Sequence, residues 1–206
     1  MYSQNKEEQY ILEYFGDRVG TFLSLGENDG QTFSNVRALA LKGWKGVMVE
    51  PSPKAFERLK TLYNGHKGFY LYPFAVSAHN GKAMLQDSGP LCTANDIGLV
   101  STFHSCEVAR FSRTVKYEPV EVKTFKWKTF LNRLKSIKMQ EFTMISMDIE
   151  GDEPFVLPDM DLSKTDLICI EHNGNKSRKD KFLEHTSKFG ISKIIYESGE
   201  NLIIVR

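Results

Sequence analysis

The chain has 206 residues, of which 41% are hydrophobic and 26% are charged, and its formal net charge is +1. This length and composition suit one ordinary domain with its own core, so we predict a single domain over residues 1–206. A charge this close to neutral attracts polyanions weakly, and we expect no nucleic-acid partner. The N-terminus is polar, no apolar run reaches the ~20 residues of a membrane span, and the three cysteines form no CxxC pair. We therefore expect a soluble, cytoplasmic protein without a membrane partner.

The first half of the sequence alternates between helix and strand patterns. Residues 9–15 carry apolar groups at helical spacing, with Ser3 as the expected N-cap. The predicted strands are 21–25, 47–50 and 70–76, and the predicted helices between them are 32–42 and 53–63. Such alternation with short connections implies a parallel sheet that binds ligands at the carboxyl ends of its strands.

The second half begins with a long segment that lacks periodicity. Residues 87–118 are rich in glycine and small polar residues, and we predict a substrate lid there. Beyond the lid we predict strands at 120–125, 144–148, 167–171, 194–196 and 201–205, and helices at 127–137 and 181–189. The short turn at 198–200 makes the last two strands antiparallel.

The most informative motif is a glycine turn after the first strand. The strand ending at Leu25 runs into residues 26–30 (GENDG), and the next strand ends in Glu50. Glycines let the backbone approach a ligand closely, and a carboxylate at the next strand end can accept hydrogen bonds from both ribose hydroxyls. The GxxxG spacing lacks the tight pyrophosphate turn of GxGxxG, which favours a nucleoside cofactor without pyrophosphate. The expected cofactor-binding residues are Gly26, Asn28, Asp29, Gly30, Glu50 and, at the end of the third strand, Ser77.

Several motifs, taken in order, resemble the FkbM-type methyltransferases. They are residues 3–8 (SQNKEE), 25–30 (LGENDG), 43–51 (GWKGVMVEP), 75–77 (AVS), 99–102 (LVST) and 147–153 (MDIEGDE). The resemblance covers about residues 3–173. It implies an α/β class I methyltransferase (Rossmann-like) fold, a three-layer sandwich whose seven-stranded, mostly parallel sheet has its last strand antiparallel. It also implies S-adenosylmethionine (SAM) as cofactor and a hydroxyl acceptor, often on a sugar or natural product.

The chain departs from the family pattern at the glycine turn. The family carries an acidic residue where this chain has Ser24, and an alanine where it has Glu27. The family's acidic residue lies next to the methionine end of the cofactor. Its absence weakens cofactor binding unless Glu27 or Asp29, in the same turn, compensates.

Acidic and imidazole groups follow the two central strands of the second half. Asp148 ends one strand, and Glu171, His172 and Asn173 end the next. Such groups can act as a base or hold a divalent cation such as Mg²⁺. Catechol-type and some macrolide-sugar methyltransferases bind magnesium at these strand ends, and by that analogy we expect Asp148, Glu171 and His172 or Asn173 as ligands. The alternative is that Asp148 caps a turn and Glu171 forms a structural ion pair.

The predicted lid contains one histidine, His104, which can serve as a general base at neutral pH or lie on the surface without a role. The catalytic candidates are therefore Asp148, His104 and His172. We expect an O-methyltransferase that acts on a sugar or small-molecule hydroxyl. The alternatives are an RNA ribose methyltransferase, which needs a basic groove that we do not find, and a non-catalytic SAM-binding module.

Overall fold

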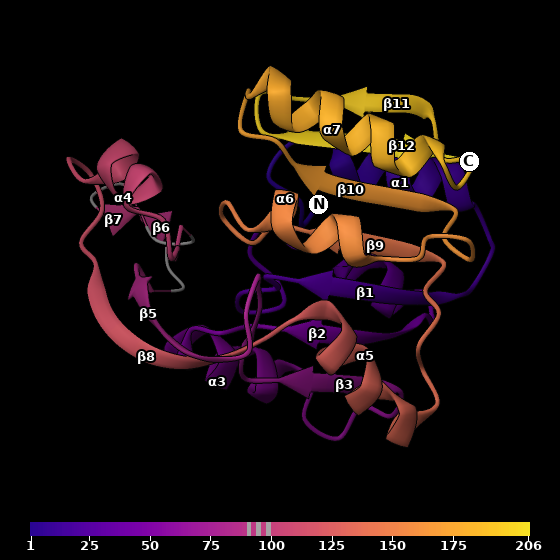
Figure 1. The fold of residues 1–206 in the computed structure, drawn as a ribbon. Coiled ribbons are helices and arrows are strands. Elements are labelled where there is room, and N and C mark those ends of the chain that lie inside the picture. Colours follow the sequence, from indigo (N-terminus) through magenta and orange to yellow (C-terminus); the bar gives the residue numbers. More distant parts are fainter. Residues whose placement is uncertain (90–91, 94–95, 98–99) are drawn as a thin grey trace.

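The computed structural model describes residues 1–89, 92–93, 96–97 and 100–206. A seven-stranded sheet forms its centre, with the strand order β11-β12-β10-β9-β1-β2-β3 (Figure 1). The strands are β1 (Thr21–Leu25), β2 (Lys45–Val49), β3 (Phe69–Tyr72), β9 (Met144–Met147), β10 (Leu167–Glu171), β11 (Lys193–Glu197) and β12 (Asn201–Val205). Neighbouring strands pair in parallel except at β12, which runs antiparallel to both β10 and β11. The predicted sheet, with its last strand antiparallel, is confirmed.

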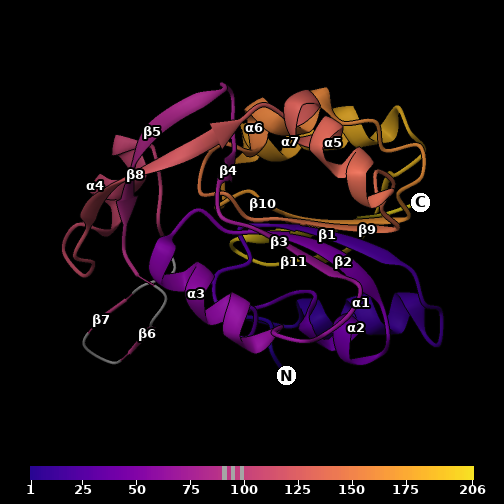
Figure 2. The same cartoon turned by 90° about the horizontal axis from the view of Figure 1, so that it is seen from below.

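Helices cover both faces of this sheet, as Figure 2 shows. One face carries α1 (Glu7–Phe15), α2 (Arg37–Leu41) and α3 (Pro53–Leu62), and the other carries α5 (Trp127–Leu134), α6 (Glu153–Val156) and α7 (Lys176–Ser187). Successive side chains of a strand point to opposite faces, so Phe22 packs with Trp44 in one core cluster and Leu23 packs with Phe130 in the other. Burial on both faces explains why the central strands are almost continuously apolar.

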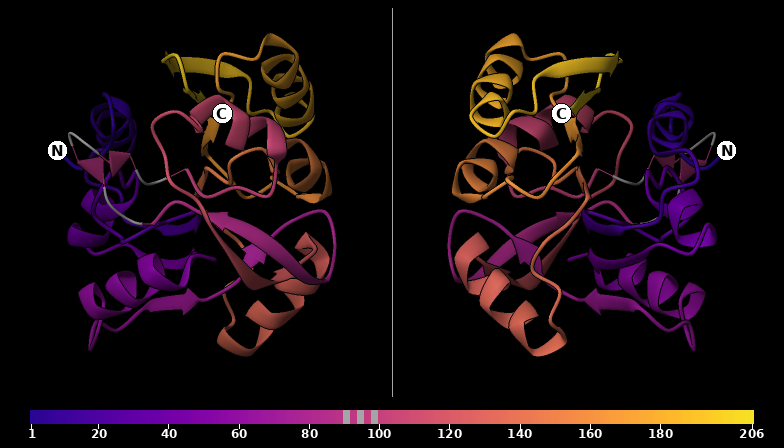
Figure 3. Two further views of the ribbon diagram at one scale, coloured as in Figure 1. Left: turned by 90° about the vertical axis from the view of Figure 1, so that its left-hand side faces the viewer. Right: turned by 90° about the vertical axis from the view of Figure 1, so that its right-hand side faces the viewer.

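A smaller sheet stands beside the large one, with the strand order β4-β8-β5. Its strands are β4 (Ala75–Val76), β5 (Gly81–Asp87) and β8 (Glu118–Phe125). The antiparallel pair β5–β8 brackets a segment that contains β6 (Cys92–Thr93), β7 (Asp96–Ile97) and α4 (Ser105–Phe111). Figure 3 shows α4 beside the helices of the C-terminal half, and Arg178 of α7 donates to Glu107 of α4 over 3.2 Å. The α4 part of the predicted lid is thus tied back towards the large sheet, while residues 90–91, 94–95 and 98–99 of that prediction lie outside the described residues.

Two predictions near the N-terminus are wrong. Ser3 is not the N-cap residue of the first helix, because the helix begins only at residue 7 and Lys6 holds the N-cap position, but the Ser3 hydroxyl accepts a hydrogen bond from the backbone N–H of Glu8 in the first turn. The helix predicted over 32–42 is confined to α2. The Asp29 carboxylate binds the backbone N–H groups of residues 31 and 32 and holds them in a turn. The Ser34 hydroxyl binds the N–H groups of residues 36 and 37, where the helix begins.

Other boundaries shift for local reasons. The strand predicted over 70–76 breaks after Tyr72, where Pro73 lacks an N–H to continue the ladder, and the residues beyond it form β4 in the smaller sheet. The strand predicted over 120–125 also lies in that sheet, as part of β8. The helix predicted over 127–137 ends in a 3₁₀ turn (Lys135–Ile137), and a second such turn spans Leu157–Asp159. The helix predicted over 181–189 starts at residue 176, where the Asn175 side chain caps it.

Within the described residues, no helix is both long and apolar enough to cross a membrane.

Candidate active site

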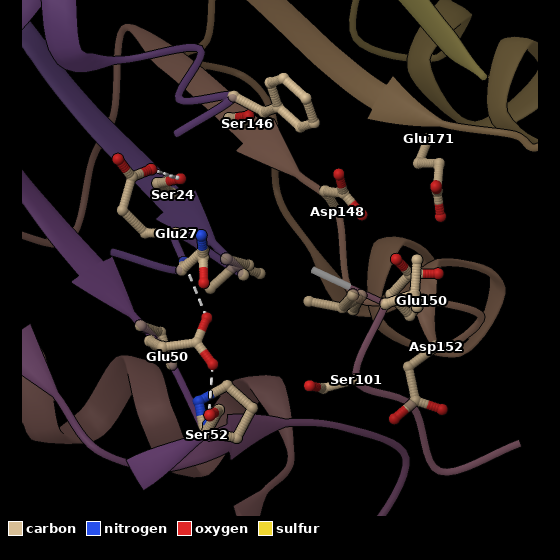
Figure 4. A pocket seen from close by; sticks show the side chains of 18 of the residues that line it. Ser24, Glu27, Glu50, Ser52, Ser101, Ser146, Asp148, Glu150, Asp152 and Glu171 are labelled. Carbon is tan, nitrogen blue, oxygen red and sulfur yellow. Dashed lines mark hydrogen bonds between the residues drawn. The ribbon is translucent and has the colours of Figure 1, made fainter. Parts of the chain in front are cut away.

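A cavity of about 340 Å³ lies where β1, β2, β9 and β10 end. Its walls come from the glycine turn, from the residues that follow these four strands, and from the segment 100–111 that includes α4. Figure 4 shows two groups of carboxylates in this cavity, one around Glu27 and Glu50 and the other around Asp148 and Glu171. The volume is within the range of small-molecule sites.

Glu50 lies on the cavity wall at the end of β2. One carboxylate oxygen accepts a hydrogen bond from the Asn28 backbone N–H at 2.8 Å, and the other accepts one from the Ser52 N–H at 2.7 Å. The side chain is buried, and burial raises the pKa of Glu50 to about 7. Each carboxylate oxygen can accept more than one hydrogen bond, so Glu50 retains capacity for two hydroxyl donors.

The glycine turn is packed against the end of β9. A Cβ on Gly26 would lie 1.7 Å from the Asp148 carbonyl oxygen, and its φ of +80° also favours glycine, so no other residue fits there. Gly30 lies off the cavity wall and packs against Leu59 of α3, where a Cβ would lie 2.6 Å from the side chain. Asp29 is likewise off the wall, because its carboxylate binds the backbone N–H groups of residues 31 and 32.

Glu27 places a buried carboxylate directly beside Ser24. The Ser24 hydroxyl donates to one carboxylate oxygen at 2.5 Å, and the Ser34 hydroxyl donates to the other at 2.6 Å. Burial raises the pKa of Glu27 to about 7. Of the two residues expected to compensate for Ser24, Glu27 lies on the cavity wall and Asp29 does not.

Three other carboxylates converge on the opposite wall. Asp148, Glu150 and Glu171 each offer an oxygen, and the three oxygens lie within 4.8 Å of one another. Burial, followed by the repulsion of neighbouring carboxylates, raises the pKa of Glu150 and Glu171 well above the usual range, and burial raises that of Asp148 to about 6. The Oε2 atoms of Glu150 and Glu171 have no hydrogen-bond partner among the described residues.

The predicted histidines and Ser77 lie off this cavity wall. His172 directly follows Glu171, so its ring leaves the extended chain on the other side and lines a separate pocket beside the start of α7. Of the residues expected to hold a metal, Asp148, Glu171 and the alternative Asn173 line the cavity and His172 does not, while Glu150, which was not expected, lies beside Asp148 and Glu171. His104 reaches the cavity only indirectly, because its Nε2 lies 2.8 Å from Oδ1 of Asp152, which lines the wall.

The sequence analysis assigned no site role to several residues that line the cavity. They are Asn35, Ser101, Arg110, Ser146, Glu150 and Asp152. Glu150 and Asp152 belong to the MDIEGDE motif, so the motif itself was the available signal. Glu150 faces the cavity because its backbone has a φ of +51°, which is unusual for a residue other than glycine. The sequence does not predict this conformation.

Comparison with known proteins identifies the family and the fold. The model of the methyltransferase FkbM domain matches residues 24–193. No curated protein matches the sequence. The ribosomal protein L11 methylase from Lactobacillus delbrueckii subsp. bulgaricus has a similar structure, with a TM-score of 0.50, 10% identity, and coverage of 98% of this chain and 77% of that chain.

The magnesium protoporphyrin IX methyltransferase from Synechocystis PCC 6803, solved with bound SAM, has a TM-score of 0.49, 8% identity, and coverage of 97% of this chain and 76% of that chain. At such low identity a structural likeness shows only a shared fold, here the Rossmann-like class I methyltransferase fold. The family match spans most of the sequence. The chain therefore belongs to the FkbM family of SAM-dependent methyltransferases.

Proposed function

We propose that this protein transfers the methyl group of SAM to a hydroxyl of a sugar, a glycan or a small natural product. The observation that carries the proposal is one cavity whose two walls suit the two reactants. Glu50 and the glycine turn form a nucleoside-type wall, and Asp148 lies on the wall opposite. A methyl donor held on the first wall would meet an acceptor held on the second.

The cofactor would lie along the glycine turn. Its two ribose hydroxyls would donate to the free lone pairs of Glu50, and Gly26 would let the backbone approach the cofactor. The buried carboxylate of Glu27 would attract the ammonium group at the methionine end, in the role that the family gives to an acid at position 24. Ser77 stays a prediction for the adenine end.

The reaction requires an in-line displacement. The acceptor oxygen attacks the methyl carbon, the carbon–sulfur bond breaks, and its electron pair stays on the sulfur of S-adenosylhomocysteine. A sugar hydroxyl holds its proton tightly at neutral pH, so a base must take this proton as the carbon–oxygen bond forms. Asp148 is the proposed base, because it lines the cavity and burial raises its pKa to about 6, close to neutrality.

His104 remains a candidate for a later proton transfer. Its Nε2 lies 2.8 Å from Asp152, and its side chain is 30% exposed, so a proton that reached Asp152 would have a route to solvent. The ring stacks beside Phe155, and a Cβ on Gly151 would lie 2.7 Å from it, so the local packing fixes the position of the ring.

The charge of the cavity favours a neutral acceptor over RNA. Carboxylates line both walls, and Arg110 is the only cationic side chain among the described residues that line the cavity. Its guanidinium group lies 3.5 Å from Glu107, which partly neutralises it. A phosphate backbone would be repelled here, whereas a neutral sugar or polyol would find many hydrogen-bond acceptors.

The test is methyl transfer from SAM labelled on its methyl group to a panel of neutral sugars, nucleotide sugars, natural-product alcohols and RNA oligonucleotides. We expect a methyl ether on a neutral hydroxyl, identified by mass spectrometry. Asp148→Asn should abolish transfer, while calorimetry still detects SAM binding. Methylation of RNA ribose would support the first alternative, and SAM binding without transfer to any acceptor would support the non-catalytic module.

A further inference from the structure

Two buried carboxylates of the cavity wall lack the interactions that burial normally requires. Glu150 is 7% exposed and Glu171 is 6% exposed, and both face the cavity together with Asp148. The Oε2 atom of each glutamate is without a hydrogen-bond donor among the described residues. A buried charged oxygen without a partner is strongly unfavourable, so this arrangement points to a missing positive partner.

The protein itself does not supply that partner. In the described part of the chain, no basic nitrogen lies within 4.0 Å of the carboxylate oxygens of Asp148, Glu150 or Glu171. The two nearby arginines both bind Glu107 instead, Arg110 at 3.5 Å and Arg178, through Nη2, at 3.2 Å. The three carboxylates therefore face one another without a counter-charge.

The neighbouring Glu153 has a structural role, and backbone N–H groups of the turn after β9 form hydrogen bonds to its carboxylate. Its carboxylate accepts hydrogen bonds from the backbone N–H groups of Ile149, at 2.8 Å, and Gly151, at 3.1 Å. Glu153 thus closes the turn after β9, whereas Glu150 in the same turn points its carboxylate into the cavity. Within this turn, the backbone thus satisfies Glu153 and leaves Oε2 of Glu150 without a donor.

We propose that Asp148, Glu150 and Glu171 together bind a divalent metal cation that prefers oxygen ligands, such as Mg²⁺, Mn²⁺ or Ca²⁺. Two oxygens bound to one ion lie at most two metal–oxygen bonds apart, which is about 4 Å for Mg²⁺ and about 5 Å for Ca²⁺. The three oxygens already lie within 4.8 Å of one another, so small side-chain rotations suffice. Three carboxylates and no sulfur or imidazole ligand select hard cations over zinc.

The ion would also have a use in the reaction. Three protein ligands leave further coordination positions for water or for an acceptor hydroxyl, and a cation lowers the pKa of a hydroxyl that it binds. This catalytic role rests on the proposed O-methyl transfer. The binding of the cation does not, because it follows from the carboxylates alone.

The test uses the full chain, treated with a chelator and desalted, and titrated with Mn²⁺ while the spectrum of the free ion is followed by electron paramagnetic resonance. We expect a dissociation constant of about 1 mM or tighter, since about 1 mM is the weak end of the range for protein sites that bind Ca²⁺ through oxygen ligands. Glu150→Gln and Glu171→Gln preserve shape and remove charge, and each should weaken binding at least about tenfold. Glu27→Gln is the matched control, a buried carboxylate on the opposite wall with both oxygens hydrogen-bonded, and should leave Mn²⁺ binding unchanged.

A second measurement does not depend on the variants folding. In crystals of the wild-type protein soaked in Mn²⁺, the anomalous peak should lie between the carboxylates of Asp148, Glu150 and Glu171. No Mn²⁺ binding up to about 10 mM, a peak elsewhere, or equal affinity in the two glutamine variants would overturn the proposal. SAM titrated without Mn²⁺ tests the proposed function separately, because either ligand can fail to bind while the other binds.

Discussion

The two walls of the cavity are both lined by buried carboxylates, but they differ in how those carboxylates are satisfied. On the wall formed by β1 and β2, every oxygen of Glu27 and Glu50 accepts a hydrogen bond from a serine hydroxyl or a backbone N–H. On the wall formed by β9 and β10, Glu150 and Glu171 each keep an oxygen without a donor among the described residues. The carboxylates of the first wall are hydrogen-bonded without a charged ligand, whereas those of the second wall are not.

This difference separates two uses of a buried acid. A carboxylate held by neutral donors keeps a fixed orientation and can accept further hydrogen bonds from a hydroxyl or an ammonium group. A carboxylate that faces other carboxylates is stable only with a proton or a cation. The first arrangement suits recognition of a cofactor, and the second suits chemistry on an acceptor.

The largest expected loss of SAM affinity follows from changing Glu50, on the wall of β1 and β2. Glu50→Ala removes both acceptors proposed for the ribose, and SAM binding measured by calorimetry should weaken at least about 100-fold, because each hydrogen bond to a charged group contributes about 1.5–3 kcal/mol. Glu57→Ala, an exposed carboxylate on α3 that pairs with Lys60, is the matched control and should bind SAM normally. Equal affinities in the two variants would remove Glu50 from the site.

The pH dependence of stability should show the cost of burying Glu27. Its pKa is raised from 4.5 to about 7, so the folded protein binds more protons than the unfolded chain between these values, and the free energy of unfolding should rise as the pH falls from 8 to 5. The contribution of one such group is on the order of 3 kcal/mol. Glu27→Gln should flatten the slope in urea unfolding with a chelator present, although Glu50 keeps part of it. An unchanged slope would show that burial does not raise the pKa of Glu27, and that Glu27 is charged at pH 8 in the folded protein as in the unfolded chain.

A smaller change in SAM affinity is expected when the acid of the glycine turn is removed from position 27 and placed at position 24. Glu27→Ala should weaken SAM about tenfold, while 5′-methylthioadenosine, which lacks the ammonium group, should bind as in the wild type. Adding Ser24→Asp to Glu27→Ala restores the family pattern and should recover most of the affinity. If both ligands weaken equally in Glu27→Ala, the residue supports the turn and does not recognise the ammonium group.

The smallest change in SAM affinity is expected for a substitution of Ser77. Its side chain is buried at the end of β4 and does not line the cavity, so Ser77→Ala should change the affinity for SAM less than about twofold. A larger loss, again measured by calorimetry, would restore the sequence prediction that Ser77 contacts the adenine, and would show that this edge of the cavity closes when the cofactor binds.

Elements marked by a pattern of residues close in the chain were predictable, and those defined only by interactions between distant residues were not. Strands such as 21–25, 167–171 and 201–205 were predicted with their observed bounds, because a short apolar run is a local pattern. The smaller sheet was missed, since β4 and β8 pair across about 50 residues and β4 has only two. The length of helix α2 was overestimated because the Asp29 carboxylate holds residues 31 and 32 in a turn and the Ser34 hydroxyl sets the start of the helix at residue 37.

The sequence by itself determined the seven strands of the large sheet, the glycine turn and the acid at the end of β2, because these follow from local periodicity and from backbone limits at single positions. Only the tertiary structure decided which side chains meet. It brought Glu27 against Ser24 and Ser34, and it joined Glu150 to Asp148 and Glu171 while His172 faced away. The physical reason is that neighbouring residues of an extended chain point to opposite sides, and that one residue with a positive φ redirects a side chain without any sign in the composition.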